Sequence, residues 1–277
     1  MRWGVTALCC VPAATFVAEV LVGTPPRKRR VTARAAAASP RTVILVPAHN
    51  ERSVIVGTLD NLRGELDEQT SLLVVADNCE DDTPALAEGA GARVVRRVDP
   101  SRRGKGYAIE FGLEELAKDP PEIVVIVDAD CRVEKGSIRI LAERAHSTGR
   151  PVQAEYLILP PRLEPRTAVN AVAFLIKNRV RPLGLLRLGL PTQLTGSGMA
   201  FPWAVIRKAP AMGAYLVEDM LMGLELARLG SPALFCPEAR VRSELPLRDQ
   251  AQSGQRRRWE HGHLATLIGR ASCRERV

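Results

Sequence analysis

Two aspartates, Asp128 and Asp130, directly follow a run of five aliphatic residues at positions 123–127. The run predicts a buried parallel strand, and ligands of open α/β sheets collect at the carboxyl ends of such strands. Side chains two residues apart in an extended chain point to the same side, so the two carboxylates face one way and Ala129 the other. Hard oxygen ligands with no His or Cys between them suit Mg²⁺ or Mn²⁺, which completes its shell with phosphate oxygens. The pattern predicts a metal–diphosphate site, the alternative being a strand capped by solvated acids.

The segments around these aspartates alternate between strand and helix patterns. Short aliphatic runs predict strands at residues 42–46, 71–76, 93–95 and 123–127. Amphipathic stretches predict helices at residues 53–62, from 82 onward and at 107–116. This alternation predicts an α/β fold with a mostly parallel central sheet and helices on both faces.

Polar residues come after several of these strands, as a nucleotide-binding crevice requires. The turn at 47–51 follows the first strand, and Asp77 and Asn78 follow the second. Asp77 can accept hydrogen bonds from a base edge or a ribose, and Lys105, between two glycines, can approach a phosphate. Each motif also has a plain structural explanation, since Asp-Asn and Gly-Lys-Gly are common in turns and loops. No G-x-G-x-x-G follows the first strand and no G-x-x-x-x-G-K-[ST] occurs, which argues against a nicotinamide dehydrogenase or a P-loop NTPase.

Charge and cysteine content exclude further classes of protein. The 277 residues carry a formal net charge of +8, but residues 1–34 hold +5 and residues 268–277 hold +2, which leaves +1 for residues 35–267. Aromatic residues make up 4% of the chain, so the basic grooves and stacking platforms of nucleic-acid-binding proteins are not evident. The six cysteines form no C-x-x-C pair, which indicates a reducing compartment without disulfides or a structural zinc site.

The N-terminal region predicts a membrane anchor. Residues 3–22 are largely apolar, with interruptions at Pro12 and Glu19, and residues 27–30 are all basic. Positive charge after the apolar run favours an anchor at 1–24 in the cell membrane, a linker at 25–40 and a cytoplasmic catalytic domain. A signal peptide and a mistranslated leader are the alternatives.

Seven groups of residues follow one another along the chain. They contain Pro47, His49 and Glu51; Asp77 and Asn78; Lys105; Asp128 and Asp130; Gly196, Ser197 and Gly198; Glu218 and Asp219; and Gln255, Arg258 and Trp259. In this order the groups resemble glycosyltransferase family 2, whose fold is called GT-A, and the resemblance covers about residues 41–267, the predicted catalytic domain. The last group resembles the Q-x-x-R-W signature of membrane-associated, cellulose- and hyaluronan-synthase-like members.

The resemblance implies an inverting glycosyltransferase that moves a sugar from a nucleotide diphosphate-sugar to a saccharide or lipid-linked acceptor, in cell-surface or exopolysaccharide synthesis. It implies that Asp219 is the catalytic base and that Asp130, with Asp128, holds Mg²⁺ or Mn²⁺. The implied donor contacts are Pro47, His49, Glu51, Asp77, Asn78, Lys105, Asp128 and Asp130. The implied acceptor and diphosphate contacts are Gly196, Ser197, Gly198, Glu218, Gln255, Arg258 and Trp259.

Residue chemistry is compatible with these roles but leaves alternatives. Asp219 and Glu218 begin an apolar helical run, where acids also serve as helix caps. Residues 196–198 have little bulk, so a sugar ring could lie against the backbone there, or they could form a simple turn. Gln255 and Arg258 share a helical face that could equally be solvated.

Two other functions stay open from the sequence. A sugar-phosphate nucleotidyltransferase also uses a nucleotide crevice and metal carboxylates, but it normally has a Gly-rich, Arg-containing loop after its first strand, unlike the turn at 47–51. The other alternative is a truncated, inactive, membrane-tethered binder of nucleotide sugars. Residues 268–277 continue no pattern and are expected to be a non-native tail, with further membrane helices expected beyond the Q-x-x-R-W segment.

Overall fold

The computed structural model describes residues 2–25, 39–159, 165–210, 213 and 218–244. The side chains of 2–9, 159, 165–167, 218 and 244 are outside this description. Most of the predicted linker, the predicted tail and the three residues Gln255, Arg258 and Trp259 therefore lie outside the described residues.

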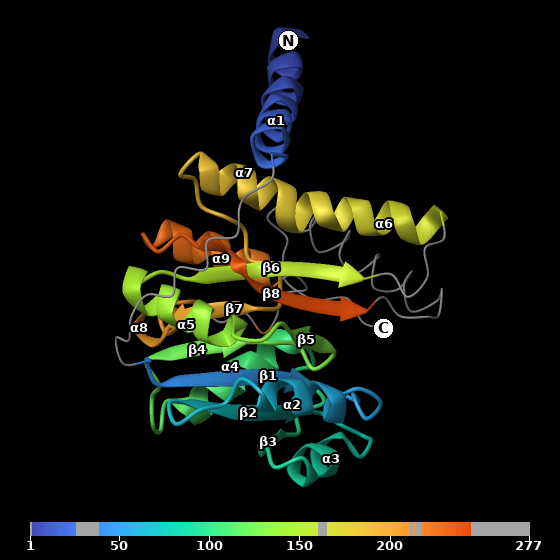
Figure 1. Cartoon of the computed structure of the whole chain (residues 1–277), viewed down its shortest axis with the longest axis vertical. Helices are drawn as coiled ribbons and strands as arrows, with labels where there is room; N and C mark the ends of the chain where they lie inside the picture. The colour runs from blue at the N-terminus through green and yellow to red at the C-terminus, as the bar shows by residue number, and fades with distance from the viewer. Residues whose placement is uncertain (1, 26–38, 160–164, 211–212, 214–217, 245–277) are drawn as a thin grey trace.

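The described residues form one eight-stranded sheet in the order β3-β2-β1-β4-β7-β6-β8-β5 (Figure 1). The strands are β1 Thr42–Ala48, β2 Thr70–Asp77, β3 Arg93–Arg97, β4 Ile123–Ile126, β5 Cys131–Val133, β6 Val152–Leu159, β7 Met199–Pro202 and β8 Leu234–Glu244. The helices are α1 Arg2–Gly23, α2 Ile55–Arg63, α3 Thr83–Gly89, α4 Lys105–Leu116, α5 Ser137–Thr148, α6 Pro165–Leu175, a π-helix η1 Ile176–Val180, α7 Arg181–Arg187, α8 Trp203–Ile206 and α9 Glu218–Arg228.

The four strands predicted from the sequence form a parallel half of the sheet, in the order β3-β2-β1-β4. The other half is mixed, because β7 runs antiparallel to both of its neighbours, β4 and β6, and β5 runs antiparallel to β8. In this second half, β7 begins at Met199, directly after the predicted group at 196–198. The predicted α/β class is confirmed, but the sheet is mixed rather than mostly parallel.

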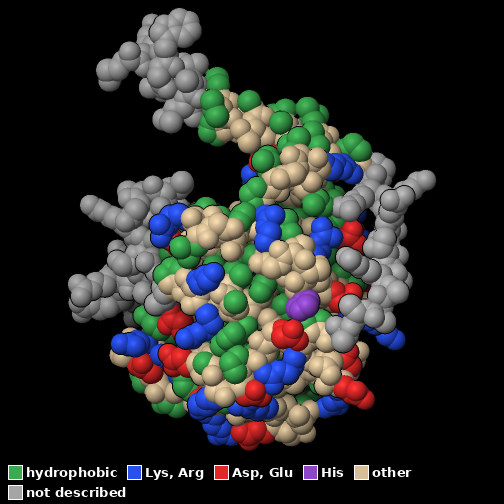
Figure 2. Space-filling view, turned by 90° about the vertical axis from the view of Figure 1, so that its left-hand side faces the viewer, with side chains coloured by type: hydrophobic (Ala, Val, Ile, Leu, Met, Phe, Trp, Pro, Cys, Tyr) green, Lys and Arg blue, Asp and Glu red, His purple; other side chains and the backbone are tan. Residues whose placement is uncertain are grey.

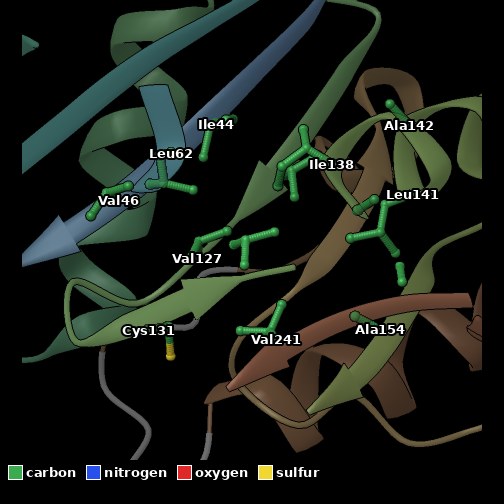
Figure 3. Packing of buried hydrophobic residues seen from close by; sticks show 14 of the residues in the cluster. Ile44, Val46, Leu62, Val127, Cys131, Ile138, Leu141, Ala142, Ala154 and Val241 are labelled. Atoms are coloured by element: carbon green, nitrogen blue, oxygen red, sulfur yellow. The ribbon is translucent and has the colours of Figure 1, made fainter. Parts of the chain in front are cut away.

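Helices cover both faces of the sheet, as predicted, because alternate residues of each buried strand point to opposite faces. Ile44 and Val46 of β1 pack with α2, α3 and α5 in one core cluster, whose packing Figure 3 shows. Val43 and Leu45 pack with α4, α8 and α9 in a second cluster. Burial on both faces explains the near-continuous aliphatic runs. Each large apolar side chain that is fully buried stabilises the fold by roughly 1.5–3 kcal/mol.

Pro47 lies inside β1 rather than in the predicted polar turn. It pairs with Val75 of β2, whereas the pairing of β1 with β4 ends at Leu45. The missing N–H of a proline therefore removes no bond from the β1–β4 ladder. β1 consequently reaches Ala48, and the polar residues that follow it project from the carboxyl edge of the sheet.

The N-terminal segment is helical, but the prediction that it is a membrane anchor is wrong. No helix among the described residues is long and apolar enough to cross a membrane. Glu19, which interrupts the apolar run, is 6% exposed and accepts a hydrogen bond from Nε of Arg181, in α7, at 2.5 Å. α1 stands on α7 through this contact (Figure 1). The predicted cell-membrane location, with its cytoplasmic orientation, depended on this anchor and is contradicted with it.

Figure 2 shows one face of the molecule, on which blue and red side chains alternate over the lower body. This interspersion of Lys and Arg with Asp and Glu is consistent with the small net charge of residues 35–267. Hydrophobic side chains gather instead on the projecting helix at the top of that view.

Candidate nucleotide and metal site

The two aspartates predicted to bind a metal lie just past the end of β4. One possible ligand atom each of Asp128, Asp130 and Cys131 lies within 4.8 Å of the others. Crowding by protein atoms and the nearby charge of Asp128 raise the pKa of Asp130, although its side chain keeps an open side toward solvent. Burial raises the pKa of the Cys131 thiol well above its usual value, so this group stays protonated. The two carboxylates are therefore the cation ligands that this cluster offers.

Lys105 is the first residue of α4, which begins two residues before the predicted helix at 107–116. The preceding Gly104 has a φ of +136°, a conformation that favours glycine, and the helix starts directly after it. The Lys105 ammonium pairs with Oδ1 of Asp128 and donates a hydrogen bond to the carbonyl of Gly196 at 2.7 Å. Lys105 thus joins the metal-binding carboxylates to the 195–198 segment.

The 195–198 segment is a tightly held loop that leads into β7. Ser197 is fully buried, and its Oγ accepts a hydrogen bond from the backbone N–H of Asp128 at 3.1 Å. Gly198 has a φ of +67°, and a Cβ there would lie 2.6 Å from Val241 and 2.8 Å from Ala154. Only glycine meets both demands at position 198, so Gly198 and the hydrogen bond of Ser197 fix the loop. The acceptor contacts of these two residues stay a prediction.

Gly196 lies beside two of the candidate residues, Asp219 and Lys105. Its φ is +91°, and a Cβ built on it would lie 3.4 Å from Oδ2 of Asp219 and 3.6 Å from Nζ of Lys105. The absence of a side chain at Gly196 therefore leaves space between the acid and the ammonium.

Asp219 lies in the first turn of α9, as predicted. Its Oδ1 accepts a hydrogen bond from the backbone N–H of Met220 at 2.8 Å. Burial raises the pKa of Asp219, while the charges of Lys105 and Lys177 oppose that rise. The neighbouring Glu218 begins the same helix, but its side chain is outside the described part of the chain.

Glu51 lies beside the aspartate pair. Burial raises its pKa to about 7, and the charges of Asp130 and Asp128 add to the effect. Its backbone N–H donates to Oγ1 of Thr83 at 2.8 Å, which ties the end of the β1–α2 turn to α3. A carboxyl with this pKa exists in both protonation states near neutral pH.

The carboxyl ends of β1 and β2 meet through His49 and Asp77. Nδ1–H of His49 donates to the backbone carbonyl of Asp77 at 2.7 Å. The buried carboxylate of Asp77 pairs with Nη1 of Arg97 at 2.6 Å and accepts a hydrogen bond from Nδ2 of Asn78 at 3.1 Å. Asp77 and Asn78, which were predicted to contact a nucleotide base or ribose, are therefore joined to Arg97 of β3.

Two residues of this region were missed by sequence reasoning, Gln153 and Arg97. Gln153 is 1% exposed in β6; its Nε2 donates to the carbonyl of Ser197 at 2.9 Å, and its Oε1 accepts from the N–H of Thr195 at 2.9 Å. Arg97 looks like one basic residue among several in an exposed strand. Polar residues at 153 and 155, within a run that ends in aliphatic residues, are the signal that could have revealed Gln153.

A family model described as "Glycosyltransferase like family 2" matches residues 40–262. The chain belongs to this family. The match covers most of the sequence, including the segment 245–262 that the structure does not describe. It does not test the likeness to cellulose and hyaluronan synthases, which stays a prediction.

Curated relatives of this chain include two named proteins. Glucosyl-3-phosphoglycerate synthase of Mycobacterium tuberculosis is 36% identical over 102 residues, which is 34% of this chain and 31% of that protein. Glycosyltransferase AglD of Haloferax volcanii is 29% identical over 177 residues, 61% of this chain and 27% of that protein. The chain thus spans about a third of the length of the curated relatives that it matches.

Solved structures show the same fold. The mannosyltransferase PcManGT of Pyrobaculum calidifontis, in complex with GDP-Man and Mn²⁺, has a TM-score of 0.65 at 21% identity, over 94% of this chain and 74% of that chain. The M. tuberculosis synthase, in complex with Mn²⁺, UDP and phosphoglyceric acid, has a TM-score of 0.56 at 24% identity, over 85% and 80% of the two chains. The predicted GT-A-like fold is confirmed by these similarities.

Proposed function

We propose that this protein is an inverting, metal-dependent glycosyltransferase that uses a nucleotide diphosphate-sugar donor. One observation carries the proposal: Lys105 pairs with Asp128 and bonds to Gly196, and Asp219 faces the same glycine. A carboxylate pair for a cation, an ammonium for phosphate and a partly buried acid thus lie around Gly196. Transfer of a sugar from a nucleotide diphosphate to an acceptor hydroxyl needs this combination, and a simple strand cap does not.

The residues present fit a divalent cation. Asp128 and Asp130 supply hard oxygen ligands, and their like charges raise the pKa of Asp130, a repulsion that a cation relieves. When bound, Mg²⁺ or Mn²⁺ would neutralise charge that develops on the leaving diphosphate. The similar structures of the mannosyltransferase and the mycobacterial synthase contain Mn²⁺, which supports the assignment.

Two side chains of the protein, those of Asp219 and Lys105, act on the reacting groups. The acceptor hydroxyl attacks the anomeric carbon from the face opposite the diphosphate, and its proton passes to the carboxylate of Asp219. The new C–O bond forms as the bond to the diphosphate oxygen breaks, so a single displacement inverts the anomeric configuration. Lys105 stabilises negative charge on the leaving side, and Gly196 leaves room for the sugar ring.

The remaining roles follow from the resemblance. Pro47, His49, Glu51, Asp77 and Asn78 border the crevice proposed for the nucleotide. Gln255, Arg258 and Trp259 are proposed to contact the diphosphate and the acceptor, with support from Glu218. These three residues lie within the family match.

The acceptor class that we propose is a saccharide or a lipid-linked saccharide, used in cell-surface or exopolysaccharide synthesis. The mycobacterial synthase structure contains phosphoglyceric acid, so small anionic acceptors belong in the same screen. The aspartate pair alone would also suit a sugar-phosphate nucleotidyltransferase, and the partly buried acid Asp219 beside Gly196 favours the glycosyltransferase.

The test is a screen of nucleotide sugars against these acceptors, with Mn²⁺, in which free nucleoside diphosphate and the anomeric configuration of the product are measured. Donor-dependent release of diphosphate and an inverted product are expected. Release of pyrophosphate from a nucleoside triphosphate and a sugar phosphate would identify a nucleotidyltransferase instead. Retention of configuration would refute the proposed role of Asp219.

A further inference from the structure

Gln153, in β6, is a buried polar side chain to which the reaction described above assigns no role. It is 1% exposed. Its Oε1 accepts a hydrogen bond from the N–H of Thr195 at 2.9 Å, and its Nε2 donates to the carbonyl of Ser197 at 2.9 Å. Nε2 also donates to the carbonyl of Ala154 at 3.0 Å. The protein therefore occupies both N–H groups of this amide, and burial keeps the side chain away from a bound substrate.

These bonds hold the residues on either side of Gly196. The peptide N–H of Thr195 and the peptide carbonyl of Ser197 are both fixed by the one amide, and Gly196 stands between them with a φ of +91°. Its carbonyl accepts a hydrogen bond from Nζ of Lys105 at 2.7 Å. Because the backbone is held before and after Gly196, this carbonyl keeps one direction, toward the start of α4.

A second set of bonds fixes the end of the 195–198 loop. The N–H of Ala154 donates to the carbonyl of Gly198 at 2.8 Å, and the N–H of Gly198 donates to the carbonyl of Ile126 at 2.9 Å. The start of the loop is held by Gln153. A carboxamide suits this task because it donates and accepts at once, whereas a carboxylate only accepts and a thioether does not donate.

We propose that Gln153 is a positioning residue for sugar transfer. Its amide sets the direction of the Gly196 carbonyl, and this carbonyl, together with Asp128, holds the ammonium of Lys105. The inference rests on the proposed function, in which Lys105 stabilises negative charge on the leaving diphosphate. That charge develops in the transition state, so a displaced ammonium lowers the rate of transfer more than the affinity for the donor. A displacement of about 1 Å in such a site can cost about 10²-fold in rate.

The first test removes both bonds of the amide. Gln153→Met keeps a side chain of similar length and volume but can neither donate to Ser197 nor accept strongly from Thr195. The kcat of sugar transfer should fall at least about tenfold. The Kd of UDP or GDP with Mn²⁺, whichever nucleotide the donor screen favours, should change by less than about threefold. A loss of binding as large as the loss of kcat would contradict the positioning role.

The second test uses pH to restore the bonds. In Gln153→Glu the introduced carboxyl is buried, which raises its pKa above the ordinary value. The protonated acid can donate to the carbonyl of Ser197 and accept from Thr195, as the amide does, whereas the carboxylate would face that carbonyl and repel it. Both proteins lose activity as Asp219 is protonated, so their rates are compared at each pH. The rate of Gln153→Glu relative to the unsubstituted chain should rise at least about threefold from about pH 8 to about pH 5.5.

Gln193→Glu is the matched control, because it makes the same change of charge two residues before Thr195, at an exposed side chain. Its relative rate should stay within about twofold of the unsubstituted chain at every pH. Thermal melting at each pH establishes that the variants are folded. If Gln153→Met does not fold, Gln153→Glu decides, since its protonated form keeps both bonds.

Hydrogen exchange of the Thr195 amide tests the contact without any measurement of activity. The amide should be protected in the unsubstituted chain and exchange at least about tenfold faster in Gln153→Met. A folded Gln153→Met with the full transfer rate, a relative rate of Gln153→Glu that does not vary with pH, or unchanged exchange of Thr195 overturns the inference and leaves the proposed function intact. If the unsubstituted chain transfers no sugar, the proposed function fails, and the inference with it.

Discussion

At the scale of single residues, the chemistry depends on how the protein holds Asp219. Burial favours the protonated acid, whereas the charges of Lys105 and Lys177 favour the carboxylate. The net result is a raised pKa, which makes the carboxylate a stronger base than an exposed aspartate. Activity should therefore be lost as pH falls through the raised pKa of Asp219. This loss should occur at a higher pH than the usual titration range of an aspartate.

Asp219→Asn separates the catalytic role from a structural one. Asparagine is about as good as aspartate at a helix N-terminus, so melting temperature should change little. An amide cannot accept the acceptor proton, so sugar transfer should fall by roughly 10²–10⁴-fold, with unchanged donor affinity. Transfer rates, donor titrations and thermal melts of the two proteins measure this. Transfer within a few-fold of the original chain would show that Asp219 is only a cap.

Glu51 predicts a pH dependence of stability. Its pKa rises from 4.5 to about 7 on folding, so between these values the native state holds a proton that the unfolded state has released. Stability must therefore fall as pH rises through this window, by about 1–2 kcal/mol once solvent screening of this partly exposed group is allowed for, with no contribution from Glu51 below pH 4.5. Denaturant unfolding of the original chain and of Glu51→Gln at several pH values tests this. A stability difference between the two proteins that does not vary from pH 4.5 to 7 would disprove it.

Residue types and order were enough to predict the candidates at Asp128, Asp130, Lys105 and Asp219, because strand ends and helix starts can be located from local patterns. The structure then brings these side chains close together. Arg97 could not be predicted in the same way, since its role depends on Asp77, twenty residues earlier. A contact across the sheet leaves no periodic signal in either strand.

At the scale of elements, the 195–198 loop is the part that most depends on distant packing. Gln153 from β6 holds two of its backbone groups, and Val241 of β8 lies against Gly198. Sequence reasoning could assign small residues to this loop, but not the strands behind it. β6 and β8 pair with each other across more than seventy residues of chain, so their neighbours are set by topology rather than by local pattern.

Gly198→Ala tests this packing, with Gly189→Ala as its control. Both glycines have a positive φ, +67° and +70°, so both substitutions strain the backbone, by about 1 kcal/mol. A Cβ at Gly189 meets nothing within 4 Å, whereas one at Gly198 overlaps Val241 and Ala154. Gly198→Ala should therefore cost about 2–4 kcal/mol in the free energy of unfolding and disturb donor binding. Equal losses for the two variants, measured by urea denaturation, would show that the loop is not held as described.

At the scale of the whole molecule, α1 is docked on α7 rather than separate from the fold. The pairing of Glu19 with Arg181 explains why an acid occurs in an apolar helix, an arrangement that the sequence pattern alone presented as an interrupted anchor. Guanidinium groups add to the contact, since Arg181 lies 5.3 Å from the ring centroid of Phe16 and Arg187 donates to the carbonyl of Pro25 at 2.6 Å.

Gly184→Ala should weaken this docking. A Cβ at Gly184 would overlap the backbone of Glu19, so α1 must move away. Cleavage by a protease within residues 2–25 should become about tenfold faster, without a change in the melting of the remaining domain. Gly57→Ala in α2, where the nearest atom is 3.5 Å from the added Cβ, is the control and should leave cleavage unchanged. Equal protection of α1 in both variants would contradict the docking.

The central claim is that Asp128 and Asp130 form a metal–diphosphate site, and titration of nucleoside diphosphates with and without Mn²⁺ tests it most directly. Asp130→Asn replaces a charged ligand by a neutral amide, and Asp119→Asn, at an aspartate that is 81% exposed, is the matched control. The account predicts that chelation weakens binding about 10²-fold in the original chain and in Asp119→Asn, whereas Asp130→Asn binds weakly under both conditions. Equally tight binding with Mn²⁺ and with chelator, or a full Mn²⁺ response in Asp130→Asn, would contradict it.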